Sequence, residues 1–282
     1  MSVRNVATYR AAFRKLHESG CFVIPNPWDV GSARYLRHLG FKALATTSSG
    51  FAFSRGMPDT GAVTRDMVLG HVAEIVAAAG LPVNADFQAG YSHSPDGVAE
   101  NVRLCVETGV AGLSIEDSTG DESRPLYELS LAVERIQAAR EAIDASGTGV
   151  LLTGRAECYL VDHPDSLGES IRRLQAYAEA GADVLFAPGP RERDAIKAIV
   201  RAVAPKPVNI LMSSNAGMRV SELAELGVRR ISVGSALARA AWTGFIRAAR
   251  ALAEEGSFAG FEGAVPFGEL EGLFREDLRS RP

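Results

Sequence analysis

The sequence predicts a single (β/α)₈ barrel, an α/β fold in which eight parallel strands alternate with helices. The main observation is a recurring local pattern in which a helix-like stretch ends in Gly and a short apolar run follows within a few residues. Gly favours the left-handed conformation that ends helices, and the runs are too short and too apolar for amphipathic helices. Six runs follow this pattern, namely SGCFVIPN, LGFKALATT, AGLPVNAD, TGVAGLSIED, AGADVLFAP and LGVRRISVG; GVLLTGRAE and KPVNILM fill the two largest gaps.

Amphipathic helical patterns occupy the segments between these runs, with apolar residues at i, i+3, i+4 and i+7 and acidic residues in the first turns. Residues 4–19 predict an extra helix that caps the bottom of the barrel. After the eighth run, Ala236–Glu255 predicts a long helix. The tail, residues 256–282, carries Phe258, Phe261, Phe267 and Phe274 and completes a C-terminal helical extension.

The 282 residues show no compositional break that would indicate a linker, so we expect one domain over residues 1–282. The alternative α/β architecture is a doubly wound open sheet. No predicted strand is followed by GxGxxG, and the sequence contains no P-loop. The barrel therefore accounts for the pattern better than an open nucleotide-binding sheet.

Composition excludes several function classes. The formal net charge is −4 and there is no basic run, so the electrostatic footprint of a nucleic-acid-binding protein is missing. The longest stretches without a charged residue, Ala43–Ser54 and Pro207–Met218, span 12 positions each, whereas a bilayer needs about 20. The N-terminus lacks the apolar region of a signal peptide, and the three cysteines have no metal or CxxC spacing. We expect a cytoplasmic protein with reduced cysteines and no membrane partner.

Polar residues gather where the predicted strands end, which is where barrel enzymes place their active sites. They are Asp86, Glu116, Asp117, Arg155 and Glu157, with Asn209 on the seventh strand and Asp59 in the loop after the second. Several carboxylates with no Cys or His ligand set describe a hard oxygen-ligand site. The sequence therefore predicts Mg²⁺ as cofactor, with Mn²⁺ as the alternative.

Two of these acids have competing interpretations. Asp117 precedes Ser-Thr and could equally cap the next helix. Asp86 follows apolar residues, and a buried carboxylate needs a cation beside it, so we expect Arg155 as its partner.

The segment TTSSGF supplies small residues and backbone N–H groups of the kind that bind an anion or an enolate oxygen. Among the histidines, His17, His38 and His71 lie on predicted helices and are expected at the surface. His93 and His163 follow the third and fifth strands and are open to a proton-transfer role, although neither has a metal or triad spacing.

The motifs SSGFAFSRGMPD, VNADFQAGY, AGLSIED, GRAE and PVNILM together resemble the isocitrate lyase/phosphoenolpyruvate mutase superfamily, from about Asn26 to Phe258. The resemblance implies a Mg²⁺-bound 2-oxo acid or enolate of pyruvate type. It implies a substrate site made by Ser49, Gly50, Phe51 and Arg155, metal ligands at Asp59, Asn84, Asp86 and Glu116, and catalytic roles for Ser49, Glu116 and Arg155. The strand-end positions themselves add Asn209 to the expected substrate site, and the lid offers Ser118, Thr119, Ser123 and Arg124 as catalytic candidates, of which we select Arg124.

Two features depart from the family pattern. Asn84 stands where the family more often has a second Asp, so Asp86 is expected to carry more of the metal binding. The lid stretch SIEDSTGDESRPLYEL lacks the Cys of the family's lyases and the Lys and Asn of its mutases. Arg124 is the natural anchor in this lid for a second carboxylate or a phosphonate.

These observations predict a lyase that breaks a carbon–carbon bond in a small 2-oxo or 2-hydroxy acid, of the methylisocitrate or oxaloacetate type. The first alternative is phosphorus–carbon chemistry of the phosphoenolpyruvate mutase or phosphonopyruvate hydrolase type. A second alternative, from another class, is a barrel that binds 2-oxo acids without catalysis. The resemblance also implies a homodimer or homotetramer in which the C-terminal region contributes to the interface.

Overall fold

The computed structural model describes residues 3–59 and 61–279. The chain forms two compact units, residues 1–236 and 237–282. The division falls at the start of the long helix that follows the eighth strand.

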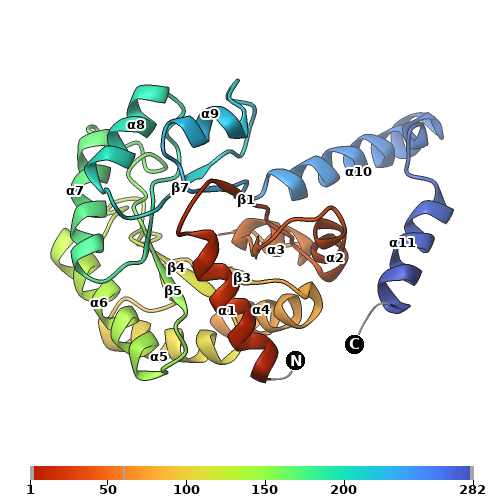
Figure 1. Ribbon diagram of the computed structural model, residues 1–282. Helices are drawn as coiled ribbons and strands as arrows, with labels where there is room; N and C mark the ends of the chain where they lie inside the picture. Colours follow the sequence, from red (N-terminus) through yellow and green to blue (C-terminus); the bar gives the residue numbers. More distant parts are fainter. Residues whose placement is uncertain (1–2, 60, 280–282) are drawn as a thin grey trace. The chain divides into compact units, whose positions relative to one another are not determined.

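The first unit is a barrel of eight parallel strands ringed by helices, which confirms the predicted fold class (Figure 1). The strands follow one another around the sheet in the order β1-β8-β7-β6-β5-β4-β3-β2. All eight predicted strands are present: β1 Phe22–Ile24, β2 Leu44–Ala45, β3 Val83–Asp86, β4 Gly112–Glu116, β5 Leu151–Arg155, β6 Val184–Phe186, β7 Val208–Leu211 and β8 Arg230–Ser232.

The helices of this unit are α1 Val3–Leu16, α2 Val30–His38, α3 Ser48–Ser54, α4 Arg65–Ala79, α5 Pro95–Glu107, α6 Leu129–Ala145, α7 Ser166–Glu179, α8 Arg193–Ala202 and α9 Val220–Glu225. Several begin at the caps that their sequences supply. The side chains of Asp29, Thr64 and Ser94, for example, accept hydrogen bonds from backbone N–H groups in the first turns of α2, α4 and α5.

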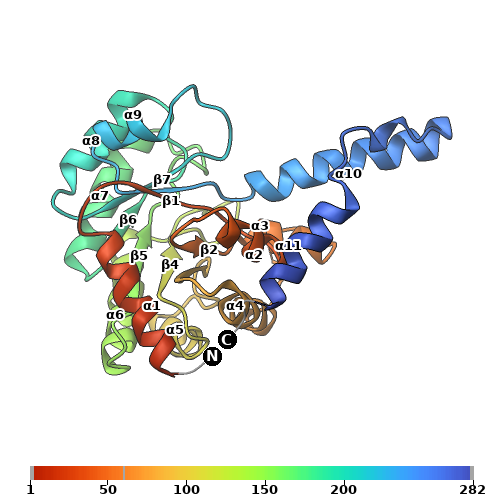
Figure 2. The same ribbon diagram turned by 45° about the vertical axis from the view of Figure 1, so that its right-hand side comes forward.

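Helix α1 closes the N-terminal end of the barrel, as predicted. Phe13 is fully buried in a cluster with Ile24, Leu151 and Val184, residues of strands β1, β5 and β6. The Arg10 side chain donates to the carbonyl oxygens of Val106 and Val110. Figure 2 shows α1 at the lower left, beside strand β5. The opposite, C-terminal end of the barrel is left for the polar strand ends.

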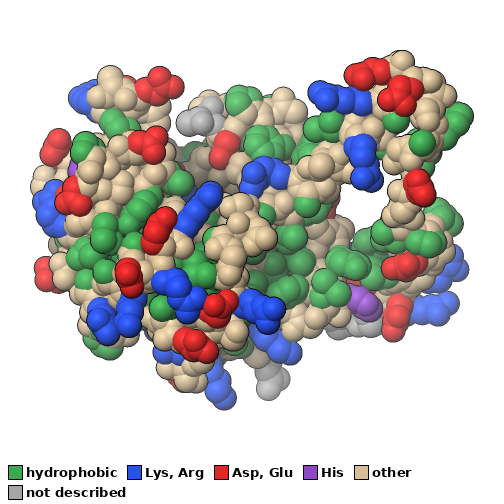
Figure 3. Space-filling model, turned by 90° about the horizontal axis from the view of Figure 1, so that it is seen from above, with side chains coloured by type: hydrophobic (Ala, Val, Ile, Leu, Met, Phe, Trp, Pro, Cys, Tyr) green, Lys and Arg blue, Asp and Glu red, His purple; other side chains and the backbone are tan. Residues whose placement is uncertain are grey.

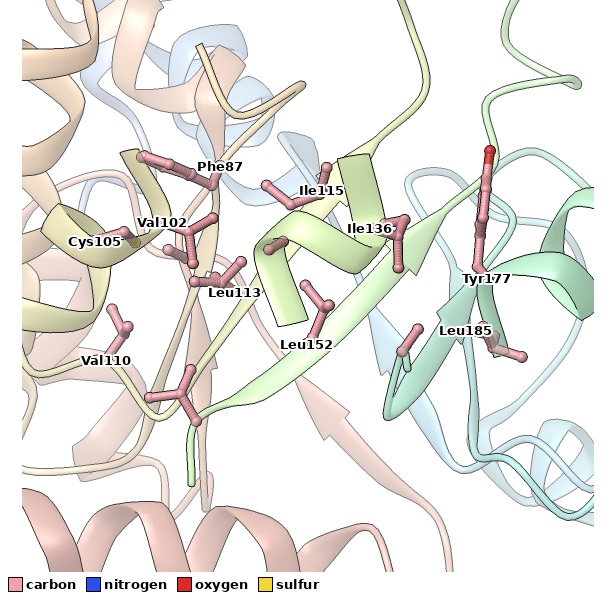
Figure 4. Close-up of a cluster of buried hydrophobic side chains, with 14 of the residues drawn as sticks. Phe87, Val102, Cys105, Val110, Leu113, Ile115, Ile136, Leu152, Tyr177 and Leu185 are labelled. Carbon is pink, nitrogen blue, oxygen red and sulfur yellow. The ribbon is translucent and has the colours of Figure 1, made fainter. Parts of the chain in front are cut away.

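The larger core lies between the strands and the surrounding helices. Phe87, Val102 and Cys105 pack on one side of it, and Ile136, Leu152 and Leu185 lie farther along the same layer (Figure 4). Near Leu185, the Tyr177 ring is in the core while its hydroxyl points away from the other labelled side chains (Figure 4). The hydroxyl is therefore directed to a polar contact outside the apolar cluster.

Histidine placement differs in part from the prediction. His38 is exposed, but His71 on α4 is only 6% exposed and its ring stacks on Phe51 at 4.0 Å between centroids. Burial lowers the pKa of His71 to about 4. The expectation that His71 lies at the surface was wrong, because α4 turns this position toward α3 and not toward solvent.

The second unit consists of helix α10 Ala236–Glu255, a short 3₁₀ helix Ala259–Phe261 and helix α11 Phe267–Arg279. Phe258, Phe261 and Phe267 are exposed by 71%, 51% and 83%, whereas Phe274 is half-buried. Within the unit, Gly260 lies so close to Ala248 that an added Cβ would meet its Cα at 2.6 Å. The tail therefore folds back on α10 while leaving most of its Phe side chains uncovered.

Over the described residues, no helix is long and apolar enough to cross a membrane. On the face shown in Figure 3, basic and acidic side chains are interspersed. All three cysteines are free thiols, and Cys105 and Cys158 are buried.

Candidate active site

The C-terminal end of the barrel brings together three residues that the sequence singled out. Asp86 ends β3, Glu116 ends β4 and Arg155 ends β5, and Glu116 and Arg155 are direct register partners. The Arg155 Nη1 atom lies 3.1 Å from Glu116 Oε2 and 3.4 Å from Asp86 Oδ1. The structure thus confirms the predicted pairing of Asp86 with Arg155.

A fourth group completes the surroundings of Arg155. The Glu157 carboxylate accepts a short hydrogen bond from Arg155 Nε, and the guanidinium lies 5.1 Å from the centre of the Phe186 ring. Burial acts to lower the pKa of Arg155, but Glu157, Glu116 and Asp86 outweigh burial and raise that pKa. Arg155 is therefore a fixed cation held by three carboxylates.

Glu116, Glu157 and Asp117 hold their protons more strongly than ordinary carboxyl groups do. Burial raises the pKa of Glu116 well above its ordinary value, with Arg155 opposing the change and Glu157 and Asp86 reinforcing it. Burial likewise raises the pKa of Glu157, and of Asp117 beside it. The physical cause is an excess of negative charge in a poorly hydrated space.

Asp59 lies in the loop after α3 and joins the same region. Its carbonyl and carboxylate oxygens both accept from Gln88 Nε2, at 3.3 and 3.4 Å. Burial and the neighbouring Asp86 raise the pKa of Asp59, while hydrogen bonds from the side chains of Ser48 and Ser49 oppose that rise. The Ser49 hydroxyl is thus placed among the candidate metal ligands.

The segment predicted to bind an anion forms the short helix α3. The Ser48 N–H donates to Asp86 Oδ2 at 2.9 Å, which ties α3 to β3. The N–H groups of Gly50 and Phe51 donate to the side-chain and backbone oxygens of Thr47. Two of the three N–H groups expected to face a substrate carboxylate are therefore engaged within the helix.

Two predicted site residues lie apart from the carboxylates. Asn84 sits two residues before Asp86, and a Cβ added at Gly112 would lie 2.7 Å from both Asn84 Oδ1 and Phe13 Cε1, so this amide is close to the capped end of the barrel. Asn209 is buried, accepts from Arg230 Nε at 2.9 Å and donates to Ser232 Oγ at 2.9 Å. The structure does not bring Asn84 or Asn209 into contact with Arg155.

The lid is folded as a small loop. Ser118 and Leu126 form an antiparallel bridge, and the Thr119 side chain donates to the Arg124 carbonyl. The Arg124 side chain is 85% exposed and its nearest acidic group is Asp121, at 3.8 Å. In this conformation Arg124 is not part of the cluster around Arg155.

His93 and His163 lie together with the lid at a cavity of about 810 Å³, lined also by Arg124, Tyr127 and Asp162. His93 Nδ1 is 2.6 Å from the Tyr127 hydroxyl, and His163 Nδ1 accepts from the Asp165 N–H. Neither histidine contacts the carboxylates.

Sequence reasoning missed two residues of the loop after β3. Gln88 and Tyr91 have φ values of 47° and 56°, a backbone conformation that residues other than Gly rarely adopt. Gln88 binds Asp59 through its side chain and Glu116 through its carbonyl. The Tyr91 hydroxyl is buried without a hydrogen-bond partner, and burial together with Asp86 and Glu116 raises its pKa. The only signal was the motif FQAGY after the strand.

Asp117 does not cap a helix, which was one of the two interpretations of this residue. Helix α6 begins at Leu129 and its N-cap is Glu128, so Asp117 caps no helix. Instead its carboxylate accepts from Arg173 at 3.1 Å, from the Tyr177 hydroxyl at 2.5 Å and from the Glu157 N–H at 2.8 Å.

The residues at this end of the barrel fit a hydrated divalent cation. Three buried or half-buried carboxylates, those of Asp86, Glu116 and Glu157, contact the single guanidinium of Arg155, and Asp59 lies near enough to Asp86 and Arg155 for their charges to affect its pKa. Among the described residues, no three His, Cys, Asp or Glu side chains form a ready-made ligand set. Carboxylate oxygens that carry excess negative charge but do not surround the ion completely suit a cation held partly through water, as Mg²⁺ usually is.

A sequence profile described as phosphoenolpyruvate phosphomutase matches residues 13–253. The chain belongs to this family. It is thereby a member of the isocitrate lyase/phosphoenolpyruvate mutase superfamily, as its motifs predicted.

Individual proteins that are similar to this chain support the same family assignment. A crystal structure from Burkholderia cenocepacia J2315, provisionally described as a lyase/mutase, superposes with a TM-score of 0.92 at 49% identity, covering 96% of this chain and 98% of that one. Oxaloacetate decarboxylase of Pseudomonas entomophila is 31% identical over 80% of this chain and 78% of its own. Oxaloacetate acetylhydrolase in complex with oxalate superposes with a TM-score of 0.85 at 26% identity, covering 97% and 96%.

Proposed function

We propose that this family member is a Mg²⁺-dependent lyase that cleaves a carbon–carbon bond in a small 2-oxo or 2-hydroxy diacid. The observation that carries the proposal is the arrangement of Arg155 between Asp86 and Glu116, with further carboxylates on the same end of the barrel. Similarity to oxaloacetate decarboxylase over most of both chains supports a substrate of this size and class.

Arg155 and Ser49 would bind the substrate. Arg155 is a permanent cation whose planar guanidinium suits a carboxylate, and its contacts to Glu116, Asp86 and Glu157 limit its motion. The Ser49 hydroxyl, near Asp59, supplies a further donor. Held in this way, the substrate's reacting bond has a fixed orientation, which is a large part of the rate gain in such enzymes.

Glu116 is the candidate for proton exchange. Because burial raises its pKa, this carboxyl can take a proton from a substrate hydroxyl and return it to a carbanion near neutral pH more readily than an ordinary Glu. For a 2-hydroxy diacid, the hydroxyl proton passes to Glu116, one carbon–carbon bond breaks to leave an oxo product and an enolate, and the same proton is delivered to the enolate carbon, so no proton is consumed overall. For a 2-oxo diacid, the bond that breaks releases CO₂ and leaves an enolate, which takes one proton at carbon.

Asp86 and Asp59 would hold the metal ion, partly through water, and Glu116 would contact a water molecule of the ion instead of the ion itself, which leaves its carboxyl free for proton exchange. When bound, a divalent cation stabilises negative charge that develops on the substrate's oxo oxygen. The polar contacts of Asp86 with the Ser48 N–H and of Asp59 with Gln88 orient these carboxylates beforehand.

A coupled screen tests the proposal. Purified protein with Mg²⁺ is mixed with oxaloacetate, 2-methylisocitrate and a panel of other four- to seven-carbon 2-oxo and 2-hydroxy diacids, and release of pyruvate, glyoxylate or oxalate is followed. Turnover of at least one diacid, lost on chelation of the metal, is the expected result. Tight oxalate binding without turnover of any panel member would instead identify a non-catalytic 2-oxo-acid-binding barrel.

Phosphorus–carbon chemistry is the second candidate, because the matching family profile is described as a phosphomutase. Arg124 is then the residue of interest, since its exposed guanidinium on the lid could meet a phosphonate if the lid closed. Phosphonopyruvate belongs in the same screen, with phosphate release and phosphoenolpyruvate formation as readouts.

A further inference from the structure

Asp117 is the centre of a buried network directly behind Arg155. Its Oδ2 atom accepts from Arg173 Nη1 and from the Tyr177 hydroxyl, and its Oδ1 atom accepts from the Glu157 N–H. The residue is 3% exposed. Both oxygen atoms of this carboxylate therefore accept hydrogen bonds, Oδ2 from residues of α7 and Oδ1 from the segment that follows β5.

The same Arg173 guanidinium holds the end of the lid. Its Nη1 atom donates to the Tyr127 carbonyl at 2.9 Å, and the Tyr127 N–H donates to the Asp117 carbonyl at 2.9 Å. Tyr127 is therefore fixed on both sides of its backbone. The lid loop that precedes it, residues 118–126, is closed by the Ser118–Leu126 bridge and returns to the barrel at this point.

On its other side the network reaches the site. Glu157, whose N–H binds Asp117, uses its carboxylate to bind Arg155 Nε. The Asp117 N–H in turn donates to the Arg155 carbonyl at 3.2 Å. Asp117 therefore connects the lid end with Arg155. Its backbone N–H binds the Arg155 carbonyl, and its carboxylate binds Glu157, which holds the Arg155 side chain.

The packing at Gly154 shows why Tyr177 reaches Asp117. A Cβ added at Gly154, the residue before Arg155, would lie 2.9 Å from Tyr177 Cβ. The absence of a side chain at position 154 lets α7 approach β5 closely enough for the Tyr177 hydroxyl to reach the strand end.

We infer that Arg173 and Tyr177 are positioning residues, which act through Asp117 and Glu157 to hold the Arg155 guanidinium and the lid end in one fixed relationship. The inference rests on the proposed function, because it concerns the orientation of the proposed substrate-binding arginine. Burying this many charges has a desolvation cost that an apolar contact between α7 and β4 would not have. The orientation of Arg155 is a function that would explain why these charges are buried despite that cost.

Arg172 and Arg173 provide a matched comparison on one helix. Both side chains bind Glu169 at 2.7 Å. Arg172 is 58% exposed and points away from the network, whereas Arg173 is only 7% exposed and binds Asp117 and Tyr127. A change at Arg172 therefore removes the Arg172–Glu169 ion pair and leaves the contacts of Arg173 with Glu169, Asp117 and Tyr127 in place.

The experiment compares Arg173→Lys, Tyr177→Phe and the control Arg172→Gln in the full chain. Lysine keeps the charge of residue 173 but loses the forked geometry, and phenylalanine keeps the ring of residue 177 but loses one hydrogen bond. Hydrogen exchange measured by mass spectrometry reports on peptides covering residues 117–128, and steady-state kinetics on the best substrate from the screen give kcat and KM. Thermal melting establishes the temperature at which each variant is fully folded.

We expect Arg173→Lys to speed exchange in the lid peptides by about tenfold, with the other strands unchanged, because a charge-assisted hydrogen bond to Tyr127 is lost. kcat should fall by about tenfold with KM changed less than about threefold, since Arg155 stays in the site but is no longer held for the transition state. Tyr177→Phe should show both changes, faster exchange in the lid peptides and lower kcat, to a smaller degree, and Arg172→Gln should match wild type in both readouts.

Wild-type exchange in the lid peptides of both variants would overturn the inference. So would faster exchange spread over the whole barrel with unchanged kcat, which is the outcome of a purely structural role. If Arg173→Lys does not fold, Tyr177→Phe decides the question alone. If wild type turns over nothing in the screen, the proposed function fails while the exchange measurement still tests the coupling between the lid end and α7.

Discussion

Arg155 and Glu116 end neighbouring strands as direct register partners, with 3.1 Å between Nη1 and Oε2. Each influences the other's protonation: the carboxylate helps to keep the guanidinium charged, and the guanidinium limits the rise in the Glu116 pKa that burial causes. The pair combines a permanent cation that can bind a carboxylate with an acid suited to proton exchange.

Arg155→Lys should lower kcat/KM by about a hundredfold. The shorter, single-centred ammonium cannot bind Glu157 and Glu116 together and still present a fork to a substrate carboxylate. Steady-state kinetics on the best substrate from the screen measure the change. Arg172→Lys on the surface of α7 is the control, and a wild-type rate for Arg155→Lys would remove Arg155 from the mechanism.

Asp86→Ala should reduce turnover by at least about a hundredfold while the barrel remains folded, since the change removes a proposed ligand and adds no bulk. Circular dichroism confirms the fold and the coupled assay measures the rate. Asp96→Ala, at an exposed position on α5, should keep wild-type activity. Near-normal activity of the Asp86 variant would show that the metal site lies elsewhere.

Mg²⁺ should stabilise the folded protein independently of any substrate. At a metal concentration 100 times its dissociation constant, the free energy of unfolding should rise by about 2.7 kcal/mol. Thermal melting with and without Mg²⁺ measures this difference. Asp86→Asn should show little or no such rise, and an equal rise in wild type and in this variant would contradict the assigned ligands.

His71 should make stability depend on pH in mildly acidic solution. Its folded-state pKa is about 4, below the value of 6.5 expected for the unfolded chain, so unfolding takes up a proton between these values. The contribution is fully present above pH 6.5 and is lost as the pH falls toward 4. At pH 5 the loss amounts to about 2 kcal/mol.

Chemical denaturation of wild type and His71→Gln at pH 7 and pH 5 tests this expectation. The raised pKa values of the site carboxylates act in the opposite direction but are common to both proteins, so the difference between them isolates His71. His38→Gln, at an exposed position, should retain the wild-type pH dependence. A His71→Gln protein that loses as much stability as wild type would show that His71 is protonated in the fold.

We propose that the protein assembles as a homodimer or homotetramer through its C-terminal unit. Phe258, Phe261 and Phe267 are exposed by more than half, as are Phe245 on α10 and Leu278 on α11. Exposed apolar groups of this number are typical of an interaction surface. Light scattering at micromolar concentration should give at least twice 29.9 kDa, and Phe258→Ser/Phe267→Ser should weaken the assembly. A stable monomer would contradict the proposal.

The order of elements and the identity of the strand-end residues were predictable because both depend on local rules. Gly at a helix end and a short apolar run after it are properties of neighbouring residues, and they are enough to place Asp86, Glu116 and Arg155 at one edge of the barrel. The pairing of Asp86 with Arg155 followed from the cost of an isolated buried charge.

Only the tertiary structure decided which side chains join the cluster around Arg155 and which have other partners inside the barrel. Asn209 and Asn84 have the sequence neighbours of site residues, yet Asn209 binds Arg230 and Asn84 lies near Phe13. Asp117 and Arg173 are 56 residues apart and meet because α7 packs closely on Gly154. The sequence by itself thus determined the eight strands and the chemistry of their ends, while long-range packing determined the partners of each charge, because a buried ion pair depends on the distance between elements that no local pattern encodes.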